Sequence, residues 1–341
     1  MINTVYRLVA PKLFNSVYQD VDPKTSEVIV RPTHLSICKA DERYYLGNRD
    51  PHILEEKLPM ALIHEGIGRV VHDRSGEFKS GDTVVMVPNV PLEDDAVISE
   101  NYLNSSKFRS SDFDGFLQEY VVTTADQVLK IDDHINPYVA AFTELISVCL
   151  HAISRMDRFA HARRDTVGVW GDGNVGFITS LLLKETFPET EVIVFGRNPE
   201  KLSYFTFANE TRIINEIPDD LKVDHAFECV GGIKSQSAIE QIIDHINPEG
   251  TIALLGVSEY SIPINTRMIL EKGIFLFGNS RSGKIDFKKT LDLLNKNREI
   301  VSYLENLVVE KVKIRNLEDI GDAFEKNLGI DFGKIILLWD K

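Results

Sequence analysis

The chain has 341 residues, of which 43% are hydrophobic and 26% charged, and its formal net charge is −14 at pH 7. This composition is typical of a globular protein of about two domains. The negative charge argues against nucleic acid or an acidic membrane as a partner, because both would be repelled. No apolar run is long enough to span a bilayer, and polar residues interrupt the apolar N-terminus, so we expect no signal peptide and a cytoplasmic location.

The first part of the chain is typical of a mostly β domain, because short β-branched segments alternate with turns rich in glycine, proline and aspartate. The expected strands are Glu27–Pro32, Gly66–His72, Thr83–Pro88, Phe116–Thr123 and Gln127–Ile131. Near Pro137 the pattern changes to a helical run, Val139–Met156.

Beyond residue 165 strands and helices alternate, which indicates an α/β doubly wound parallel sheet, a Rossmann domain. The expected strands are Thr166–Trp170, Glu191–Phe195, Arg212–Asn215, His225–Val230, Thr251–Gly256 and Ile274–Gly278, and the helices are Gly176–Phe187, Pro199–Ala208 and Ser235–Ile246. From about Arg281, two helical stretches and a final strand, Lys334–Trp339, are expected to return to the β domain. We therefore expect one domain from residues 1–147 and 281–341, and a Rossmann domain at 148–280.

A glycine turn lies between the first Rossmann strand and its helix, which is the context of a dinucleotide site. Gly171 permits the tight turn, Gly173 lets the backbone approach a pyrophosphate, and Gly176 lets helix and strand pack closely. Asn174 and Val175 open the helix, whose unpaired N–H groups attract phosphate. A purely structural glycine turn is the alternative.

The end of the second Rossmann strand indicates which nicotinamide binds. NAD sites place an acid there for the ribose 2′-hydroxyl, whereas a 2′-phosphate needs a cation. The strand ends in Gly196 and Arg197, with Lys201 one turn further on, so the sequence favours NADP(H). On this basis Gly196→Asp should shift the preference toward NADH. The alternative is that Arg197 only points to solvent.

Three later strands end in residues that can surround a ligand, because ligands of such sheets bind at the carboxyl ends of the strands. These residues are Cys229, Val257 and Asn279. Their alternative role is ordinary turn chemistry.

A set of metal-ligand residue types lies in and after the β domain. Cys38, His64 and either Glu65 or Glu144 supply the thiolate, imidazole and carboxylate that a catalytic Zn²⁺ takes, with one position left for substrate. The other two cysteines, Cys149 and Cys229, have no such partners, and we expect both in the core. Three scattered cysteines are too few for a disulfide framework.

The order of these motifs resembles the zinc-dependent medium-chain dehydrogenase/reductase family. The motifs are Cys38-x-x-Asp41, His64-Glu65-Gly66-x-Gly68-x-Val70, Gly81-Asp82-x-Val84, Asp114-Gly115-Phe116-x-x-Glu119-Tyr120-Val121 and Glu144-Leu145-x-Ser147, ahead of the glycine turn. Longer strings are similar to the ribulose-5-phosphate reductases within that family, among them Leu62-Ile63-His64-Glu65-Gly66, Phe108-Arg109-Ser110-Ser111 and Ser280-Arg281-Ser282-Gly283. The resemblance covers essentially the whole chain and implies a GroES-like zinc domain followed by an NADP-binding Rossmann domain.

The resemblance implies that Cys38, His64 and Glu144 ligate zinc, with Glu65 as a further or exchanging ligand. Three anionic ligands would over-neutralise the ion, so we hypothesise that one carboxylate leaves when the substrate oxygen arrives. Asp41 is expected to accept the second N–H of the His64 imidazole and so fix its tautomer. An ordinary turn aspartate is the alternative.

One position departs from the family. Many members carry Ser or Thr two residues after the cysteine, where a hydroxyl passes a proton to the alkoxide, but this chain has Ala40. The remaining candidates for the proton donor are a zinc-bound water acting with Glu65, the Tyr44 hydroxyl and the Tyr45 hydroxyl, and the sequence does not choose among them.

The reaction that the resemblance implies is reduction of the C2 ketone of D-ribulose 5-phosphate to D-ribitol 5-phosphate by NADPH and zinc. The substrate phosphate needs cations, for which Arg281, with Ser280 beside it, and then Arg43 are the candidates. Arg281 could instead serve a subunit interface or the cofactor. Arg281→Ala should raise KM for ribulose 5-phosphate far more than KM for NADPH.

Two competing functions remain at this point: a zinc polyol dehydrogenase that uses an unphosphorylated sugar, and a noncatalytic NADP-binding scaffold. The family also implies a homodimer that pairs the Ile274–Asn279 strands across a two-fold axis. A cytidylyltransferase that activates ribitol 5-phosphate with CTP, for ribitol teichoic acid or capsule precursors, is the expected metabolic partner.

Overall fold

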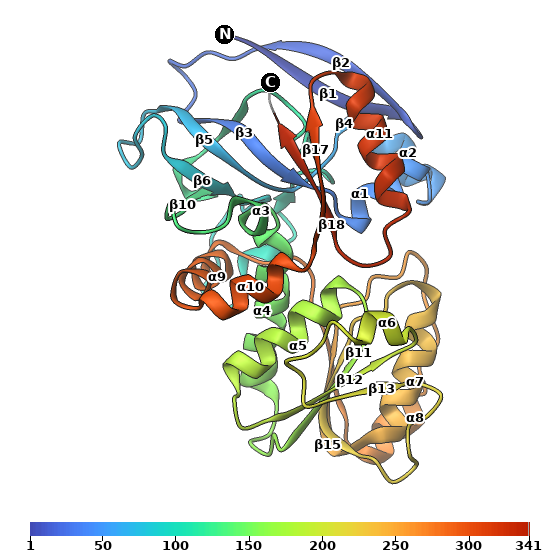
Figure 1. Cartoon of the computed structure of the whole chain (residues 1–341). Coiled ribbons are helices and arrows are strands. Elements are labelled where there is room, and N and C mark those ends of the chain that lie inside the picture. Colours follow the sequence, from blue (N-terminus) through green and yellow to red (C-terminus); the bar gives the residue numbers. More distant parts are fainter. Residues whose placement is uncertain (340) are drawn as a thin grey trace. The chain divides into compact units, whose positions relative to one another are not determined.

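The computed structural model describes residues 1–339 and 341. The chain divides into two compact units, which are considered separately (Figure 1). Unit 1 comprises Met1–Ser147 and Arg281–Lys341, and unit 2 comprises Val148–Ser280. The GroES-like domain and the Rossmann domain expected from the sequence are the two architectures observed.

Unit 1 is built on β-sheets. One sheet has the order β2-β1-β4, and a larger one has the order β10-β6-β5-β3-β18-β17, with β9 also paired to β3. The strands are β1 (Ile2–Ala10), β2 (Leu13–Asp20), β3 (Val28–Ser36), β4 (Met60–Ala61), β5 (Glu65–Asp73), β6 (Thr83–Met86), β7 (Asn89–Val90), β8 (Lys107–Phe108), β9 (Val121–Thr123), β10 (Val128–Lys130), β17 (Val308–Ile314) and β18 (Lys334–Trp339). The short strands β7 and β8 form a separate antiparallel pair.

The helices of unit 1 lie around these sheets (Figure 1). They are α1 (Lys39–Leu46), α2 (Pro51–Lys57), α3 (Pro137–Ala140), α9 (Lys284–Lys296), α10 (Arg298–Glu305) and α11 (Leu317–Leu328), with 3₁₀ turns η1 (Glu100–Tyr102) and η2 (Ala125–Gln127). Helix α4 (Thr143–Phe159) begins in unit 1 and continues into unit 2.

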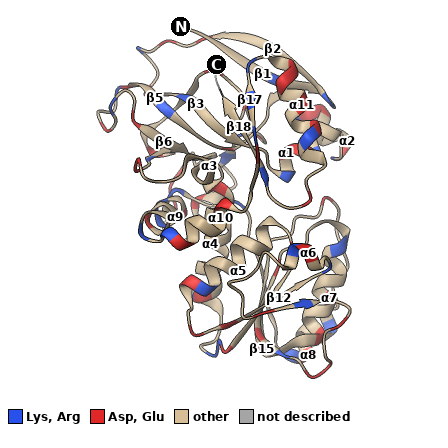
Figure 2. Ribbon diagram, in the orientation of Figure 1, with Lys and Arg blue, Asp and Glu red and all other residues tan. Residues whose placement is uncertain are grey.

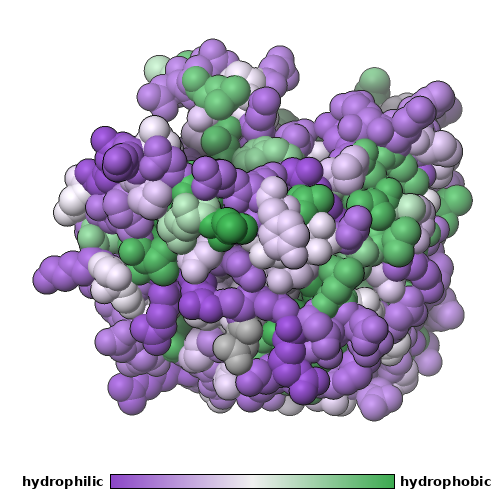
Figure 3. Space-filling model, turned by 90° about the horizontal axis from the view of Figure 1, so that it is seen from above, coloured by the Kyte–Doolittle hydropathy of each residue, from purple (hydrophilic) through white to green (hydrophobic). Residues whose placement is uncertain are grey.

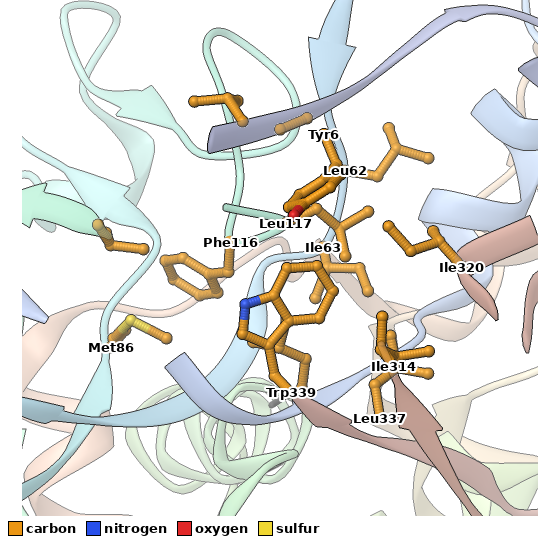
Figure 4. Packing of buried hydrophobic residues seen from close by; sticks show 14 of the residues in the cluster. Tyr6, Leu62, Ile63, Met86, Phe116, Leu117, Ile314, Ile320, Leu337 and Trp339 are labelled. Atoms are coloured by element: carbon orange, nitrogen blue, oxygen red, sulfur yellow. The ribbon is translucent and has the colours of Figure 1, made fainter. Parts of the chain in front are cut away.

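The C-terminal strand returns to the N-terminal domain, as expected. Strand β18 pairs antiparallel with β3, so that Ile336 lies opposite Ser36. The core that this pairing closes includes Trp339, whose ring meets that of Tyr6 edge-on at 5.4 Å (Figure 4). Continuing the same register by two residues places Lys334 opposite Cys38. The last strand therefore reaches the predicted metal centre.

Unit 2 is a parallel sheet with the strand order β13-β12-β11-β14-β15-β16. Its strands are β11 (Thr166–Trp170), β12 (Glu191–Gly196), β13 (Glu210–Ile213), β14 (Val223–Glu228), β15 (Ile246–Leu254) and β16 (Phe275–Gly278). Its helices are α5 (Asn174–Thr186), α6 (Pro199–Leu202), α7 (Ser235–His245) and α8 (Thr266–Lys272), with the 3₁₀ turn η3 (Gly232–Lys234). Helix α5 covers one face, and α7 and α8 cover the other, so the sheet is doubly wound (Figure 1).

Some sequence predictions were wrong in detail. The helix expected at Pro199–Ala208 ends at Leu202, and a turn follows. Of the strand expected at Phe116–Thr123, only Val121–Thr123 is extended in the sheet. The β1–β2 hairpin, helices α1 and α2 and strand β17 were not predicted. In the hairpin, Lys12 adopts a left-handed conformation with φ of 64°, which a lysine does not signal in sequence.

Charged residues are spread over the helices and loops, while the strands of unit 2 are mostly uncharged (Figure 2). One face shows hydrophobic side chains in several places among hydrophilic ones (Figure 3). Within residues 1–339 and 341, we find no helix with the length and apolar character needed to cross a bilayer.

Candidate metal centre and nucleotide site

Three of the predicted metal ligands meet in unit 1. Cys38, His64 and Glu65 each offer a ligand atom, and these atoms all lie within 4.8 Å of one another. The pairing of β3 with β5 produces this meeting, because Glu65 opens β5 opposite Ser36, the last residue of β3. Cys38, two residues after the end of β3, is the N-cap of α1. The thiol, the imidazole and a carboxylate thus converge at one end of the sheet.

Glu144 is near enough to His64 and Glu65 to interact with their charges, but it is outside the set that meets within 4.8 Å. It is buried in the first turn of α4. Burial raises the pKa of its carboxyl to about 7, and the Glu65 carboxylate adds to the rise while His64 opposes it. A positive ion between these groups would relieve this repulsion and restore the anionic form.

Asp41 orders the backbone and side chains around the group. Its carboxylate accepts hydrogen bonds from the Cys38 N–H at 3.1 Å, the Ile63 N–H at 2.9 Å and the Ser110 hydroxyl at 2.8 Å. The His64 Nδ1 lies 3.5 Å from Asp41 Oδ1, longer than a usual hydrogen bond but with the carboxylate on the Nδ1 side of the ring. Nε2 is then the nitrogen available to a metal.

Lys334 joins this group, although no motif in the sequence indicated it. Its ammonium lies 2.8 and 2.7 Å from the two oxygens of Glu65, and the two side chains are 3% and 0% exposed. Burial alone would lower the pKa of Lys334, but the charges of Glu65 and Cys38 raise it, so the lysine stays protonated. The available signal was a lysine that opens an otherwise wholly apolar strand, Ile335–Trp339.

The positive charge of Lys334 alters the charge balance expected at the metal site. The donor set of thiolate, imidazole and carboxylate fits Zn²⁺. If Cys38, Glu65 and Glu144 were all ionised around a zinc ion, they would carry three negative charges, which the ion and the buried ammonium of Lys334 would balance together. The hypothesis that one carboxylate leaves the zinc ion assumed that one negative charge was uncompensated. The ammonium of Lys334 would compensate that charge, so this reason for the hypothesis no longer holds.

An aromatic ring connects the centre to a predicted phosphate ligand. The Phe108 ring lies 5.3 Å from the His64 ring, and the Arg281 guanidinium lies 4.5 Å from the Phe108 ring centroid. Arg281 is held in a left-handed conformation with φ of 60°, an uncommon state for a non-glycine residue that concentrates at functional sites. Of the other predicted phosphate residues, Arg43 lies on α1, and Ser280 belongs to unit 2.

The two candidate tyrosines of α1 differ. The Tyr45 hydroxyl donates to Glu325 at 2.8 Å, and its ring stacks on Phe324 at 4.8 Å. The Tyr44 side chain is buried, and its hydroxyl has no hydrogen-bond partner among the described residues. Tyr44 is close enough to Arg281 to raise the pKa of that guanidinium, although burial outweighs it and the net shift is downward. Of these two tyrosines, Tyr44 is therefore the one whose hydroxyl is not engaged by another described residue.

The glycine turn in unit 2 has the geometry of a phosphate site. Gly171 has φ of 135°, and a Cβ on Gly176 would lie 1.9 Å from the Gly171 carbonyl oxygen. A Cβ on Gly173 would meet nothing within 4 Å, so this position faces open space. Gly173 is also the N-cap of α5 and supplies no side-chain cap to the N–H groups of the first turn, which Asn174 and Val175 open.

A carboxylate from another segment reaches the end of β12, where the sequence had indicated no acid. Asp172, from the glycine turn, accepts hydrogen bonds from the Arg197 N–H at 2.7 Å and the Asn198 N–H at 2.8 Å. A Cβ on Gly196 would lie 2.7 Å from the Asp172 Cβ. Gly196→Asp would therefore clash with Asp172 and place two carboxylates together, which makes it a poor test of coenzyme choice. The Arg197 side chain is exposed and Lys201 is half-buried.

The ends of the later strands are organised by Glu228, which the sequence analysis did not assign. Its buried carboxylate accepts hydrogen bonds from the Val230 N–H at 2.8 Å, the Ser235 hydroxyl at 2.9 Å and the Gly256 N–H at 3.1 Å. The predicted ligand residues at these ends are Cys229, which is buried, Val257, which is 59% exposed, and Asn279, whose N–H donates to Leu254 at 2.9 Å.

Fold and site together define the class: an α/β oxidoreductase of the zinc-binding dehydrogenase type. The sequence pattern of the alcohol dehydrogenase GroES-like domain matches residues 24–133, and that of the zinc-binding dehydrogenases matches residues 188–296.

The relatives narrow this class. The ribulose-5-phosphate reductase of Bacillus spizizenii is 55% identical over 340 residues, which covers 100% of both chains. Ribulose-5-phosphate reductase 2 of Staphylococcus aureus is 50% identical over 99% of both. The crystal structure of S. aureus TarJ in complex with NADPH matches with a TM-score of 0.90 and 45% identity over 100% of both chains. The chain belongs to the family of zinc-dependent dehydrogenases that contains these reductases, which confirms the resemblance found in the sequence.

Proposed function

We propose that this protein uses NADPH and a bound zinc ion to reduce the C2 ketone of D-ribulose 5-phosphate to D-ribitol 5-phosphate. The observation that carries the proposal is the placement of Arg281 one aromatic ring away from His64, within the unit that holds the metal ligands. A cation at this position can hold a substrate phosphate while the ketone lies at the metal. Full-length identity of 50–55% to ribulose-5-phosphate reductases supports the same substrate.

When bound, zinc supplies a Lewis acid for the ketone oxygen, and NADPH supplies the hydride. The residues of this chain hold and orient these groups. Cys38, His64, Glu65 and Glu144 would hold the ion, while Asp41 directs the His64 ring. These assignments follow the donor chemistry.

In unit 2 we assign the pyrophosphate to Gly171, Gly173 and the first turn of α5, and the 2′-phosphate to Arg197 and Lys201. Cys229, Val257 and Asn279 are proposed to border the ribose and the nicotinamide. The NADPH in the related S. aureus structure supports this choice of coenzyme.

We assign delivery of the proton to Tyr44. Ala40 has no hydroxyl, and the Tyr45 hydroxyl is occupied by Glu325. The Tyr44 hydroxyl is buried and can donate to a substrate alkoxide. Tyr44→Phe should lower kcat at least about 10-fold, with a smaller change in the KM for NADPH. Tyr45→Phe is the matched control, and equal kcat losses in both variants would reject the assignment.

The deciding experiment follows NADPH oxidation with ribulose 5-phosphate and with ribulose, before and after treatment with a chelator. We expect turnover of the phosphorylated ketose, loss of turnover after zinc removal and recovery when zinc is restored. Preference for ribulose would indicate a polyol dehydrogenase for unphosphorylated sugars. Absence of bound zinc together with no NADPH oxidation would indicate a noncatalytic scaffold.

Arg281→Ala tests the phosphate assignment within this reaction. We expect KM for ribulose 5-phosphate to rise roughly 10- to 100-fold with little change in KM for NADPH, since one charge-assisted contact is lost. Equal increases in both constants would place Arg281 in coenzyme binding or at an interface instead.

We further propose a homodimer, in which the edge strand β16 pairs with its counterpart in a second copy. Strand β16 ends the sheet order and exposes 45% of Phe275. A cytidylyltransferase would consume the product to make CDP-ribitol for teichoic acid or capsule precursors. A cytoplasmic site of action agrees with three free cysteines.

A further inference from the structure

A second cation lies beside Arg281. Lys57, the last residue of α2, places its ammonium 3.2 Å from Oδ1 of Asp112, and Arg281 Nη2 lies 3.9 Å from Oδ2 of the same carboxylate. The side chains of Lys57, Asp112 and Arg281 are 22%, 27% and 31% exposed. All three are therefore only partly open to solvent, and two cations share one anion.

Asp112 is fixed by the backbone around the ring that connects to the metal centre. Its Oδ2 accepts a hydrogen bond from the Phe108 N–H at 2.8 Å, and its own N–H donates to the Phe108 carbonyl at 2.8 Å. The carboxylate therefore has a set position relative to the Phe108 ring, which lies between His64 and Arg281. The side chains that pair with Asp112, Lys57 and Arg281, are therefore also held near the Phe108 ring.

The local charge favours a dianion. Lys57 and Arg281 bring two positive charges against the one negative charge of Asp112. Glu56 also contacts the Lys57 ammonium, at 3.1 Å, but its side chain is 66% exposed and can turn to solvent when a more highly charged anion takes its place. In a chain with net charge −14, these two neighbouring cations, one aromatic ring away from His64, mark where a phosphate can be accepted.

We infer that Lys57 is the second cation of the substrate-phosphate subsite and that Asp112 is the residue that positions it beside Arg281. This inference rests on the proposed reduction of a sugar phosphate and adds the residue that distinguishes phosphorylated from unphosphorylated ketose. A single arginine can hold a phosphate by two hydrogen bonds, and the ammonium supplies a further charge to the remaining oxygen.

The test compares Lys57→Met, Lys57→Arg and a control, Lys130→Met. Lys130 is also a lysine of unit 1 paired to an aspartate, Asp82, at 2.8 Å, but it lies on β10. We expect Lys57→Met to raise KM for ribulose 5-phosphate roughly 10-fold, with kcat and KM for NADPH within about twofold of the wild type. Lys57→Arg should restore most of the affinity, and Lys130→Met should behave as the wild type.

Two further measurements separate this role from a structural one. Turnover of unphosphorylated ribulose should be the same in Lys57→Met and the wild type, and calorimetry should show weaker binding of ribitol 5-phosphate to the variant. Asp112→Asn keeps an acceptor for the Phe108 N–H but releases Lys57 toward Glu56, so KM for ribulose 5-phosphate should rise roughly threefold. A lower KM in Asp112→Asn would overturn the positioning role.

Suppose that the wild type prefers ribulose 5-phosphate to ribulose. If Lys57→Met shows the same preference, undiminished, the inference about Lys57 is wrong. A wild type that does not reduce ribulose 5-phosphate would instead reject the proposed function itself. Failure of the inference is therefore seen in the Lys57→Met variant, and failure of the proposed function is seen in the wild type.

Discussion

The nucleotide turn and the metal centre are built in opposite ways. The turn occupies a few consecutive residues, Gly171–Gly176, and its proposed contacts to the pyrophosphate come from neutral backbone groups. The proposed metal centre draws Cys38, His64, Glu65, Glu144 and Lys334 from distant parts of the chain, and most of these residues can carry charge. The space around the backbone decides which side chains the turn can accept, whereas the balance of buried charges decides which side chains the metal centre can accept. Substitutions in the two regions should therefore fail for different reasons.

Lys334→Met should give the largest loss of stability. It leaves the Glu65 carboxylate, which is 0% exposed, without its cation, and breaking such a pair costs about 3–5 kcal/mol. Urea unfolding of the zinc-free protein measures this loss without interference from metal binding. Lys130→Met removes a more exposed ion pair and should cost less than about 1 kcal/mol.

The charge explanation has its own check in the double variant Lys334→Met with Glu65→Leu. This variant removes both charges and should regain much of the lost stability. If it is no more stable than Lys334→Met, then packing and not charge balance explains the effect.

Gly176→Ala and Gly173→Ala should separate folding from binding in the turn. The Cβ of Gly176→Ala would lie 1.9 Å from a backbone oxygen, so we expect a loss of about 1–3 kcal/mol in unfolding free energy. The Cβ of Gly173→Ala meets no protein atom within 4 Å, so stability should hold while the Kd for NADPH rises roughly 10-fold. Unchanged NADPH binding in Gly173→Ala would show that this open space is not the pyrophosphate site.

Arg197→Ala replaces Gly196→Asp as the test of coenzyme choice. Its exposed side chain can be removed without disturbing Asp172, which holds the backbone N–H of this residue. We expect the Kd for NADPH to rise roughly 10-fold and the Kd for NADH to change little, because only NADPH carries the 2′-phosphate. Equal changes in both constants would leave the 2′-phosphate without its assigned partner.

His225 gives the smallest effect, a pH dependence of stability. Burial lowers the pKa of this imidazole to about 4, and the nearby His161 adds to the shift. The unfolded chain, with a pKa near 6.5, then binds protons more readily, so stability falls as pH drops from about 6.5 toward 4. Between pH 7 and pH 6 the expected loss is less than about 1 kcal/mol.

The variant His225→Gln isolates this contribution from the other histidines. Urea midpoints at several pH values should fall less steeply with acid in the variant than in the wild type. Parallel pH profiles would show that another group titrates.

The elements of unit 2 were predicted more completely than those of unit 1. Local patterns predicted the Rossmann strands, because buried parallel strands are continuous apolar runs, but β15 begins at Ile246 and not at the expected Thr251. They overextended the helix after Pro199, since an N-cap marks where a helix starts and not where it stops. The β1–β2 hairpin and helix α1 were missed, because their form depends on the sheet that they pack against.

The sequence by itself determined the fold class, the glycine turn and the residue types of a zinc site, because each rests on local spacing or on long shared motifs. Only the tertiary structure decided which charges meet. Strand β18 placed Lys334 against Glu65, the glycine turn carried Asp172 to the end of β12, and the loop after β8 set Asp112 between Lys57 and Arg281. The physical reason is that the energy of a charge depends on distances in space and on burial, and neither is encoded in the spacing of residues along the chain.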